Sequence, residues 1–211
     1  MSTMSRVSTR LLYLARHAEP DAHEAGLTSI GLVQAQCLGQ RLAPLSVGRI
    51  IHGPLPRAAE TARIVAEQFE QSPARVEDDC AGDYVPCLPR RDEIPDAWAD
   101  TVMSFLGEVS EDEGIRGAAL GADAIDLLAG PAVDGRAPVD VVITHAFTIG
   151  WLVAHALAAP SWRWFPPMQC HAGLTVIRYE VGSPPSVVVA NDMAHLPADL
   201  QWTGFPDHLR V

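Results

Sequence analysis

Short apolar runs that end in charged residues recur along the chain and predict buried strands. Leu11–Ala15 is such a run, and it stops at the pair Arg16-His17. Residues 139–144 repeat the design with β-branched residues and stop at His145. Continuous apolar runs of this length are typical of strands covered on both faces, as in parallel sheets. Both runs are therefore predicted to be central strands.

Segments with apolar residues at helical spacing separate these strands. The first predicted helix begins at Thr28 or Ser29, either of which can cap it, and ends at Pro44. Its buried face is expected to hold Ile30, Val33, Cys37, Leu38 and Leu42. A strand over 49–52 then precedes a helix that starts at Pro56, because proline is tolerated in a first helical turn.

The rest of the chain continues this alternation. Further helices are predicted over 96–107, 111–128 and 147–157, and two strands over 173–179 and 186–190. Alternating strands and helices predict an α/β fold with a mainly parallel sheet. We expect residues 1–10 to form a flexible tail and residues 11–211 to form a single domain.

Composition narrows the class of partner. The net charge of −11 argues against nucleic acid and against an anionic membrane, since both require a basic face. The apolar run that follows the first ten residues is shorter than a signal peptide, which needs roughly 7–15, or a membrane span, which needs about 20. The four cysteines show no CxxC spacing, so we expect reduced thiols in a cytoplasmic protein and no metal site.

Four side chains are predicted to meet at one edge of the sheet: Arg16, His17, Arg57 and His145. Ligands bind past the carboxyl ends of parallel strands, and Arg57 falls in a first helical turn, where the helix dipole favours an anion. Two guanidiniums can hold phosphate oxygens while a neutral imidazole attacks phosphorus and a protonated one donates to the oxygens. This cluster supplies positive charge, so no metal or cofactor is expected.

Four segments in this order resemble the histidine phosphatase superfamily, which includes cofactor-dependent phosphoglycerate mutases. They are Arg16-His17-Ala18-Glu19, the LTxxGxxQA pattern from Leu27, the GPLPRAxxTA pattern from Gly53, and Val142–His145. The resemblance implies a three-layer sandwich with helices on both sides of the sheet. It also implies that His17 is a nucleophile that forms a phosphohistidine.

The same resemblance makes Arg16, Arg57 and His145 the phosphate pocket, with Thr28 as a further substrate-binding residue. Two departures from the family pattern matter: Ala18 stands where glycine is usual, and Ala146 stands where glycine is common. A positive φ at an alanine would be strained, so the match requires an ordinary backbone conformation there.

The family usually supplies a Glu or Asp proton donor after the second helix. Residues 80–84 stand in that place, and Asp83 is our first choice, with Asp79 and Asp78 as alternatives. Burial near Tyr84 would raise the pKa of Asp83, as a proton donor needs.

The resemblance thus implies a metal-independent phosphomonoesterase of the histidine acid phosphatase type, acting on a small-molecule phosphoester. The chain is shorter than the mutases, and a phosphohistidine open to water hydrolyses, which favours a phosphatase. Two alternatives remain: a phosphoglycerate mutase-type phosphotransferase, and a phosphate- or phosphopeptide-binding module with little turnover. A homodimer also stays open.

Overall fold

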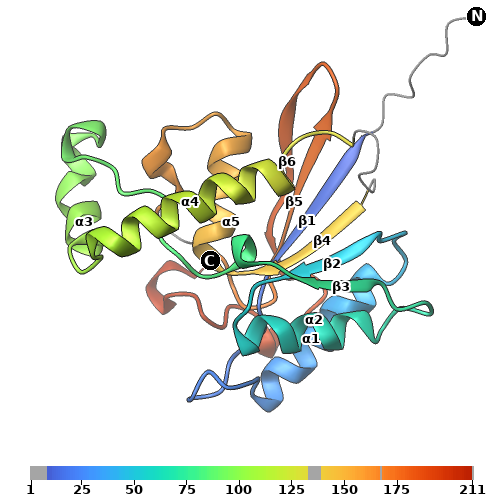
Figure 1. Ribbon diagram of the computed structural model, residues 1–211. Coiled ribbons are helices and arrows are strands. Elements are labelled where there is room, and N and C mark those ends of the chain that lie inside the picture. Colours follow the sequence, from blue (N-terminus) through green and yellow to red (C-terminus); the bar gives the residue numbers. More distant parts are fainter. Residues whose placement is uncertain (1–8, 133–138, 167, 211) are drawn as a thin grey trace, which may run out of the picture.

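The computed structural model describes residues 9–132, 139–166 and 168–210. Its sheet has six strands in the order β3-β2-β4-β1-β5-β6 (Figure 1). The strands are β1 (Arg10–Arg16), β2 (Arg49–His52), β3 (Ala74–Glu77), β4 (Val139–Thr144), β5 (Leu174–Glu180) and β6 (Ser183–Asp192). The α-helices are α1 (Ser29–Leu42), α2 (Pro56–Ala66), α3 (Asp96–Leu106), α4 (Glu111–Leu128) and α5 (Ala146–Ala156).

The sheet is mostly parallel, as predicted. Strand β1 pairs in parallel with β4, and β2 pairs in parallel with both β4 and β3. Strands β5 and β6 form an antiparallel hairpin on the other side of β1. The carboxyl ends of β1, β2 and β4 therefore meet at one edge, which confirms the predicted α/β class.

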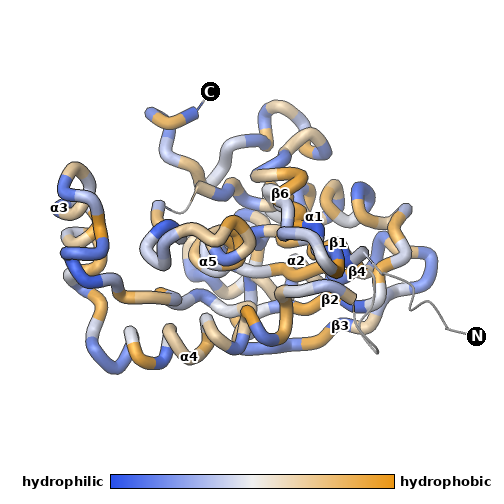
Figure 2. The backbone as a smooth tube through the Cα atoms, turned by 90° about the horizontal axis from the view of Figure 1, so that it is seen from above, coloured by the Kyte–Doolittle hydropathy of each residue, from blue (hydrophilic) through white to orange (hydrophobic). Residues whose placement is uncertain are grey.

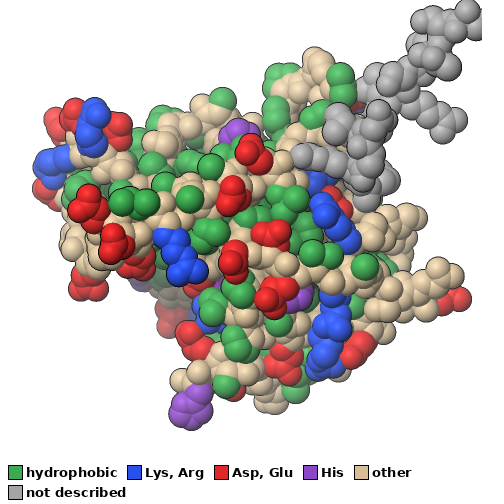
Figure 3. Space-filling view, viewed as in Figure 1, with side chains coloured by type: hydrophobic (Ala, Val, Ile, Leu, Met, Phe, Trp, Pro, Cys, Tyr) green, Lys and Arg blue, Asp and Glu red, His purple; other side chains and the backbone are tan. Residues whose placement is uncertain are grey.

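Helices cover both faces of the sheet. Leu12 and Leu14 of β1 pack with α4 and α5, whereas Ala15 faces the side of α1 and α2. Apolar positions alternate with hydrophilic ones along α4, which has one face on the sheet (Figure 2). Acidic side chains are spread over the outward face of the molecule that α4 helps to form (Figure 3).

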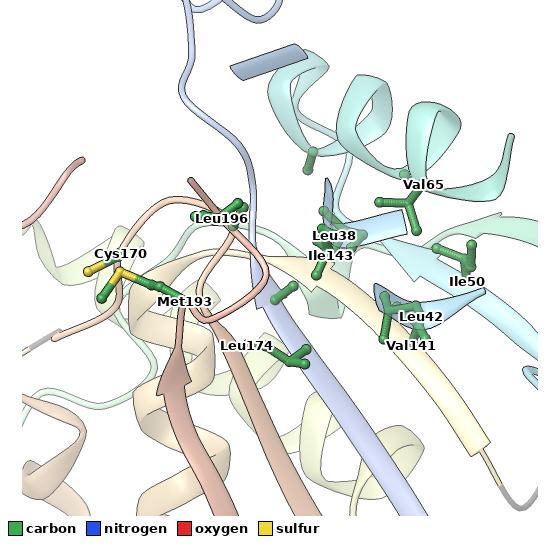
Figure 4. Packing of buried hydrophobic residues seen from close by; sticks show 14 of the residues in the cluster. Leu38, Leu42, Ile50, Val65, Val141, Ile143, Cys170, Leu174, Met193 and Leu196 are labelled. Carbon is green, nitrogen blue, oxygen red and sulfur yellow. The ribbon is translucent and has the colours of Figure 1, made fainter. Parts of the chain in front are cut away.

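The apolar cluster between the sheet and α1 and α2 fixes these helices against the strands (Figure 4). Leu38 and Leu42 of α1 and Val65 of α2 meet Ile50 and Ile143 of the sheet there. All five side chains are fully buried. This packing holds the start of α2 next to the carboxyl ends of the strands.

The predicted buried face of α1 is partly wrong. Ile30 and Val33 are more than a third exposed. The buried positions of α1 are Gly31, Gln34, Ala35, Leu38, Gly39 and Leu42. A Cβ on Gly39 would lie 3.0 Å from the Cα of Val65, so the absence of a side chain lets the two helices approach closely. Leu38 and Leu42 are buried as predicted, Cys37 is half-buried, and Gly31 and Ala35 take the buried places predicted for Ile30 and Val33.

Two further expectations need correction at the sheet margins. The tail was expected to include Arg10, but Arg10 is the first residue of β1 and is fully buried; residues 1–8 lie outside the described residues. Strand β3 was not predicted. Its four residues are all exposed, so this edge strand lacks the apolar run that identified the others.

The other predicted helices and strands are present with bounds close to those expected, although α2 ends at Ala66. The four cysteines are free thiols. None of the helices in the described part of the chain combines the length and apolar character needed to cross a bilayer.

Candidate active site

Two strand ends bring two histidines together at the carboxyl edge of the sheet. The backbone N–H of His17, just after β1, donates to the carbonyl of Thr144, the last residue of β4, at 2.9 Å. His145 follows Thr144 directly. The ring centroids of His17 and His145 lie 5.0 Å apart, and both rings are buried. Parallel pairing of β1 and β4 thus produces the juxtaposition that the sequence predicts.

His17 is held with one ring nitrogen free to react. Its Nδ1 lies 2.8 Å from the carbonyl oxygen of Ala18, which can only accept, so the proton sits on Nδ1. Its Nε2 accepts from Nε of Arg57 at 3.2 Å. Burial, and then the charge of His145, lower the pKa of His17 to about 2. The ring is therefore neutral, and Nε2 carries a lone pair that Arg57 holds in this structure.

Arg57 connects the members of the cluster. It lies in the first turn of α2 and is buried. Besides its bond to His17, Nη1 donates to Oε2 of Glu24 at 2.7 Å, and Nη2 donates to Oδ2 of Asp83 at 2.9 Å. Glu24, which the sequence reasoning did not include, is exposed and has a φ of 55°. Two carboxylates thus pair with a guanidinium that also contacts the His17 ring.

Asp83 also faces His145. Its Oδ2 lies 3.5 Å from Nδ1 of His145, and its side chain is 36% exposed. Burial raises the pKa of Asp83, although Arg57 and Arg16 oppose the shift. This is the environment of a carboxyl group that can hold a proton and also reach water.

His145 and Arg16 carry nitrogen atoms that lack partners. Both ring nitrogens of His145, and Nε of Arg16, are buried without a hydrogen bond within the described part of the chain. Burial, and then the charges of Arg57 and Arg16, lower the pKa of His145 to about 3. Buried polar atoms are rarely left unpaired, so these groups are arranged to receive a ligand with several acceptor oxygens.

The alternative donors are placed differently. Asp78 accepts a hydrogen bond from the backbone N–H of Cys80 at 2.9 Å, which occupies it as a cap. Asp79 lines a cavity of about 230 Å³ together with Asp83, Tyr84 and Arg116. The Tyr84 hydroxyl donates to the backbone carbonyls of Cys80 and Leu120. Within the described residues it makes no hydrogen bond to Asp83. Of the three acids, Asp83 is the one that contacts the cluster.

Thr28 has no hydrogen bond to the cluster within the described residues, and its role in substrate binding stays a prediction. Its hydroxyl donates to Oε1 of Glu19 at 2.8 Å and accepts from the backbone N–H of Gly31 at 3.0 Å. These are the contacts of a helix N-cap, and they use the hydroxyl group fully. Thr28 therefore orders the start of α1 beside the site.

Ala18 is accommodated without left-handed backbone. Among the described residues, the non-glycine positions with positive φ do not include Ala18. Its backbone N–H donates to Oγ1 of Thr61 at 3.0 Å, and its side chain is fully buried. An alanine can thus replace glycine here without strain.

A third histidine lies beside this cluster and was missed by the sequence reasoning. The ring centroid of His171 is 5.4 Å from that of His17. His171 comes from the loop before β5, and nothing in its sequence surroundings marks it. The residues that the structure describes contain no group of three or more His, Cys, Asp or Glu side chains arranged to hold a metal ion.

The sequence model of the histidine phosphatase superfamily (branch 1) matches residues 12–192. The chain belongs to this superfamily. No curated protein matches the sequence closely enough to count as a relative. The family match spans both histidine-bearing strand ends and the segment that contains Arg57 and Asp83.

Solved structures share the fold of this histidine phosphatase superfamily member at low identity. An alpha-ribazole phosphatase from Shigella flexneri is 18% identical with a TM-score of 0.61, covering 86% of this chain and 96% of its own. A phosphoserine phosphatase from Entamoeba histolytica, in complex with 3-phosphoglyceric acid, is 19% identical with a TM-score of 0.63, covering 89% and 100%. A phosphoglycerate mutase from Plasmodium falciparum is 20% identical with a TM-score of 0.59, covering 90% and 96%.

Proposed function

We propose that this protein is a metal-independent phosphomonoester hydrolase that acts through a phosphohistidine on His17. The observation that carries the proposal is the tautomer of His17, whose Nδ1–H is bound by the Ala18 carbonyl while Nε2 is unprotonated and faces Arg57. Members of the superfamily include phosphatases and mutases, which supports an enzyme.

In the first step the phosphoryl oxygens bind Arg16, Arg57 and His145. Nε2 of His17 attacks phosphorus as the bond from phosphorus to the ester oxygen breaks. Protonated Asp83 gives its proton to that departing oxygen, so an alcohol leaves. The incoming phosphate replaces the carboxylates on Arg57 and draws its Nε–H away from Nε2 of His17. Without the guanidinium, burial favours the protonated form of Asp83, which takes up a proton from solvent and can then act on the leaving group.

In the second step the Asp83 carboxylate takes a proton from water. The water oxygen attacks phosphorus, the phosphorus–nitrogen bond breaks, and its electron pair returns to Nε2 of His17. Inorganic phosphate leaves, and Asp83 is protonated again for the next cycle. The partial exposure of Asp83 favours a hydrolase over a mutase, because water can reach the carboxylate.

The charge of the phosphoryl group is balanced by the protein itself. Two guanidiniums and a histidine that gains a proton when the anion arrives supply the positive charge that other phosphatases obtain from metal ions. Full turnover in the presence of a chelator is therefore expected.

The test measures release of phosphate from an aryl phosphate in the presence of a chelator, for wild type and His17→Asn. It also measures how much phosphate label stays on the enzyme in base, where a phosphohistidine is stable. His52 provides a matched control, because it also ends a strand, is buried, and places Nδ1 2.9 Å from the Gly53 carbonyl. We expect His17→Asn to abolish turnover and base-stable labelling, and His52→Asn to retain both.

Other outcomes would point elsewhere. Labelling without hydrolysis would favour a mutase-type phosphotransferase, and phosphate binding without labelling would favour a binding module. Turnover that survives His17→Asn would reject His17 as the nucleophile.

A further inference from the structure

His171 is fixed by residues from two distant parts of the chain. Its backbone N–H donates to the carbonyl of Thr203 at 3.0 Å, and its Nδ1 lies 3.2 Å from Oγ1 of the same threonine. The next residue, Ala172, donates its N–H to the carbonyls of Arg16 and His17. The loop that carries His171 is thus attached both to the C-terminal segment and to the nucleophile's own backbone.

The hydrogen bonds of Gln34, through the Thr203 hydroxyl, favour one tautomer of His171. Oε1 of Gln34 accepts from the N–H of Glu19 at 2.9 Å, so the amide nitrogen points the other way and donates to Oγ1 of Thr203 at 2.7 Å. The Thr203 hydroxyl then has its own proton to give, and Nδ1 of His171 is the acceptor within reach. When that bond is made, the proton of His171 sits on Nε2, and this is the tautomer that the inference below requires.

This tautomer is the opposite of that of His17. In His17 the proton is on Nδ1 and Nε2 is a nucleophile; in His171 the proton is on Nε2, which can only donate. Nε2 of His171 has no hydrogen-bond partner within the described residues, although the side chain is only 8% exposed. Unlike the ring nitrogens of His145, Nε2 of His171 is not fully closed off from solvent, so a small anion can reach it. The ring centroid lies 5.4 Å from that of the proposed nucleophile.

A glycine packs closely against this edge of the ring. Gly204 has a φ of +70°, and a Cβ on it would lie 2.7 Å from Nε2 of His171 and 2.8 Å from Nη1 of Arg16. Nη1 of Arg16 donates to the carbonyls of Gln169 and Gly204, which fixes the guanidinium while its Nε stays unpaired. His171 and Arg16 thus meet at Gly204, where a side chain would collide with both.

We infer that His171 is a third histidine of the phosphate site, which binds an oxygen of the transferred phosphoryl group through Nε2–H beside Arg16. This inference rests on the proposed function and extends it. Because His171 is neutral, it adds a hydrogen bond without adding charge repulsion to a pocket that already holds two guanidiniums. The C-terminal segment, through Thr203 and Gly204, becomes part of the phosphate site.

Two substitutions distinguish the role of Nε2 from the role of Nδ1. The carboxamide N–H of His171→Gln reaches the place of Nε2, whereas that of His171→Asn reaches the place of Nδ1. A hydrogen bond to a charged group contributes enough that its loss weakens binding about 10- to 100-fold. We expect His171→Ala and His171→Asn to lose about this much affinity for orthovanadate and inorganic phosphate. His171→Gln should stay within about threefold of wild type.

His195→Gln is the matched control, because Nε2 of His195 lies 3.1 Å from the carbonyl of Ala172 and supports the same loop. If His171 acted only by supporting the loop, His195→Gln would weaken vanadate binding comparably and His171→Gln would not restore it. We expect the control to bind within about twofold of wild type.

Nitrogen-detected NMR of the imidazole rings gives a second readout that does not depend on activity. We expect the proton of His171 on Nε2 and that of His17 on Nδ1, and we expect Thr203→Val to abolish the preference at His171. A proton on Nδ1 of His171 would overturn the inference. Wild type that hydrolyses aryl phosphate while His171→Ala binds vanadate normally would overturn this inference alone; wild type without turnover or anion binding would overturn the proposed function as well.

Discussion

The Oδ2 atom of Asp83 lies 2.9 Å from Nη2 of Arg57, so the proposed proton donor and the phosphate-binding guanidinium are in direct contact. Substrate must break this contact, because phosphate oxygens compete for the same N–H. The donor is then released at the moment when the ester oxygen arrives. The contact between Arg57 and the Asp83 carboxylate thereby couples binding of the phosphoryl group to the proton uptake that turns Asp83 into an acid.

Substitution Asp83→Asn is expected to separate substrates by leaving group. An alkyl alcohol must be protonated as it leaves, so kcat on an alkyl phosphate should fall about 10²- to 10⁴-fold. A nitrophenolate leaves without a proton, so the labelling step with nitrophenyl phosphate should change much less. Rapid-quench kinetics with both substrates measures this. Asp79→Asn, on the same cavity, is the control, and a larger alkyl-specific loss there would move the donor to Asp79.

Glu24 occupies Arg57 from the opposite side, with Oε2 2.7 Å from Nη1. Its carboxylate competes with phosphate, so Glu24→Gln should strengthen inhibition by inorganic phosphate. The effect is at most about fivefold, because Glu24 is largely exposed and such pairs contribute about 1 kcal/mol or less. The inhibition constant for phosphate measures it.

The control for Glu24 is Glu67→Gln, which removes a comparably short and exposed ion pair with Arg63 on α2. That variant should leave inhibition unchanged. Weaker inhibition in Glu24→Gln would mean that Glu24 instead holds Arg57 in its binding position.

The strand ends explain how much of the site could be predicted from sequence. An apolar run that stops at a histidine identifies a strand end, and parallel pairing of β1 with β4 then brings His17 to His145. The position of Arg57 follows in the same way from a proline that starts a helix. These features depend on neighbouring residues in the chain, so the sequence displays them.

The parts that were missed depend on contacts between distant segments. His171 reaches the site because Thr203 and Gln34, far away in the chain, hold it there. Thr28 caps a helix, a local role that its sequence position indicates, and its substrate contact stays untested. Glu24 reaches Arg57 from a turn where residue 24 has a positive φ, and no residue pattern indicates this contact.

The three buried histidines predict how stability depends on pH. The folded-state pKa values of His17, His145 and His171 lie at about 2, 3 and 2, below the ordinary 6.5. The unfolded chain therefore binds more protons as pH falls below 6.5, and the unfolding free energy should decrease. The slope is up to about 1.4 kcal/mol per pH unit for each histidine, and vanishes above pH 6.5.

Urea unfolding of wild type and His171→Asn between pH 4 and 8 tests this. The variant should show a shallower slope below pH 6.5, by about one proton, and the same slope above it. Equal slopes at all pH values would mean that His171 is protonated in the folded protein.

A buried ion pair at the other end of the sheet should affect stability without affecting catalysis. Nη2 of Arg10 lies 2.7 Å from Oδ2 of Asp140, and both side chains are essentially inaccessible. Asp140→Asn leaves a buried guanidinium without its counter-charge, which costs about 3–5 kcal/mol. Arg10 also donates to the carbonyls of Leu128 and Gly130, so the change should loosen the end of α4 as well.

Urea unfolding and steady-state kinetics together check this prediction. Asp207→Asn breaks an exposed pair with Arg210 and should change the unfolding free energy by less than about 1 kcal/mol. For Asp140→Asn we expect a large loss of stability with kcat/KM unchanged at a temperature where the protein stays folded. A large fall in kcat/KM of the folded variant would mean that this pair positions the carboxyl ends of β1 and β4, where His17 and His145 follow.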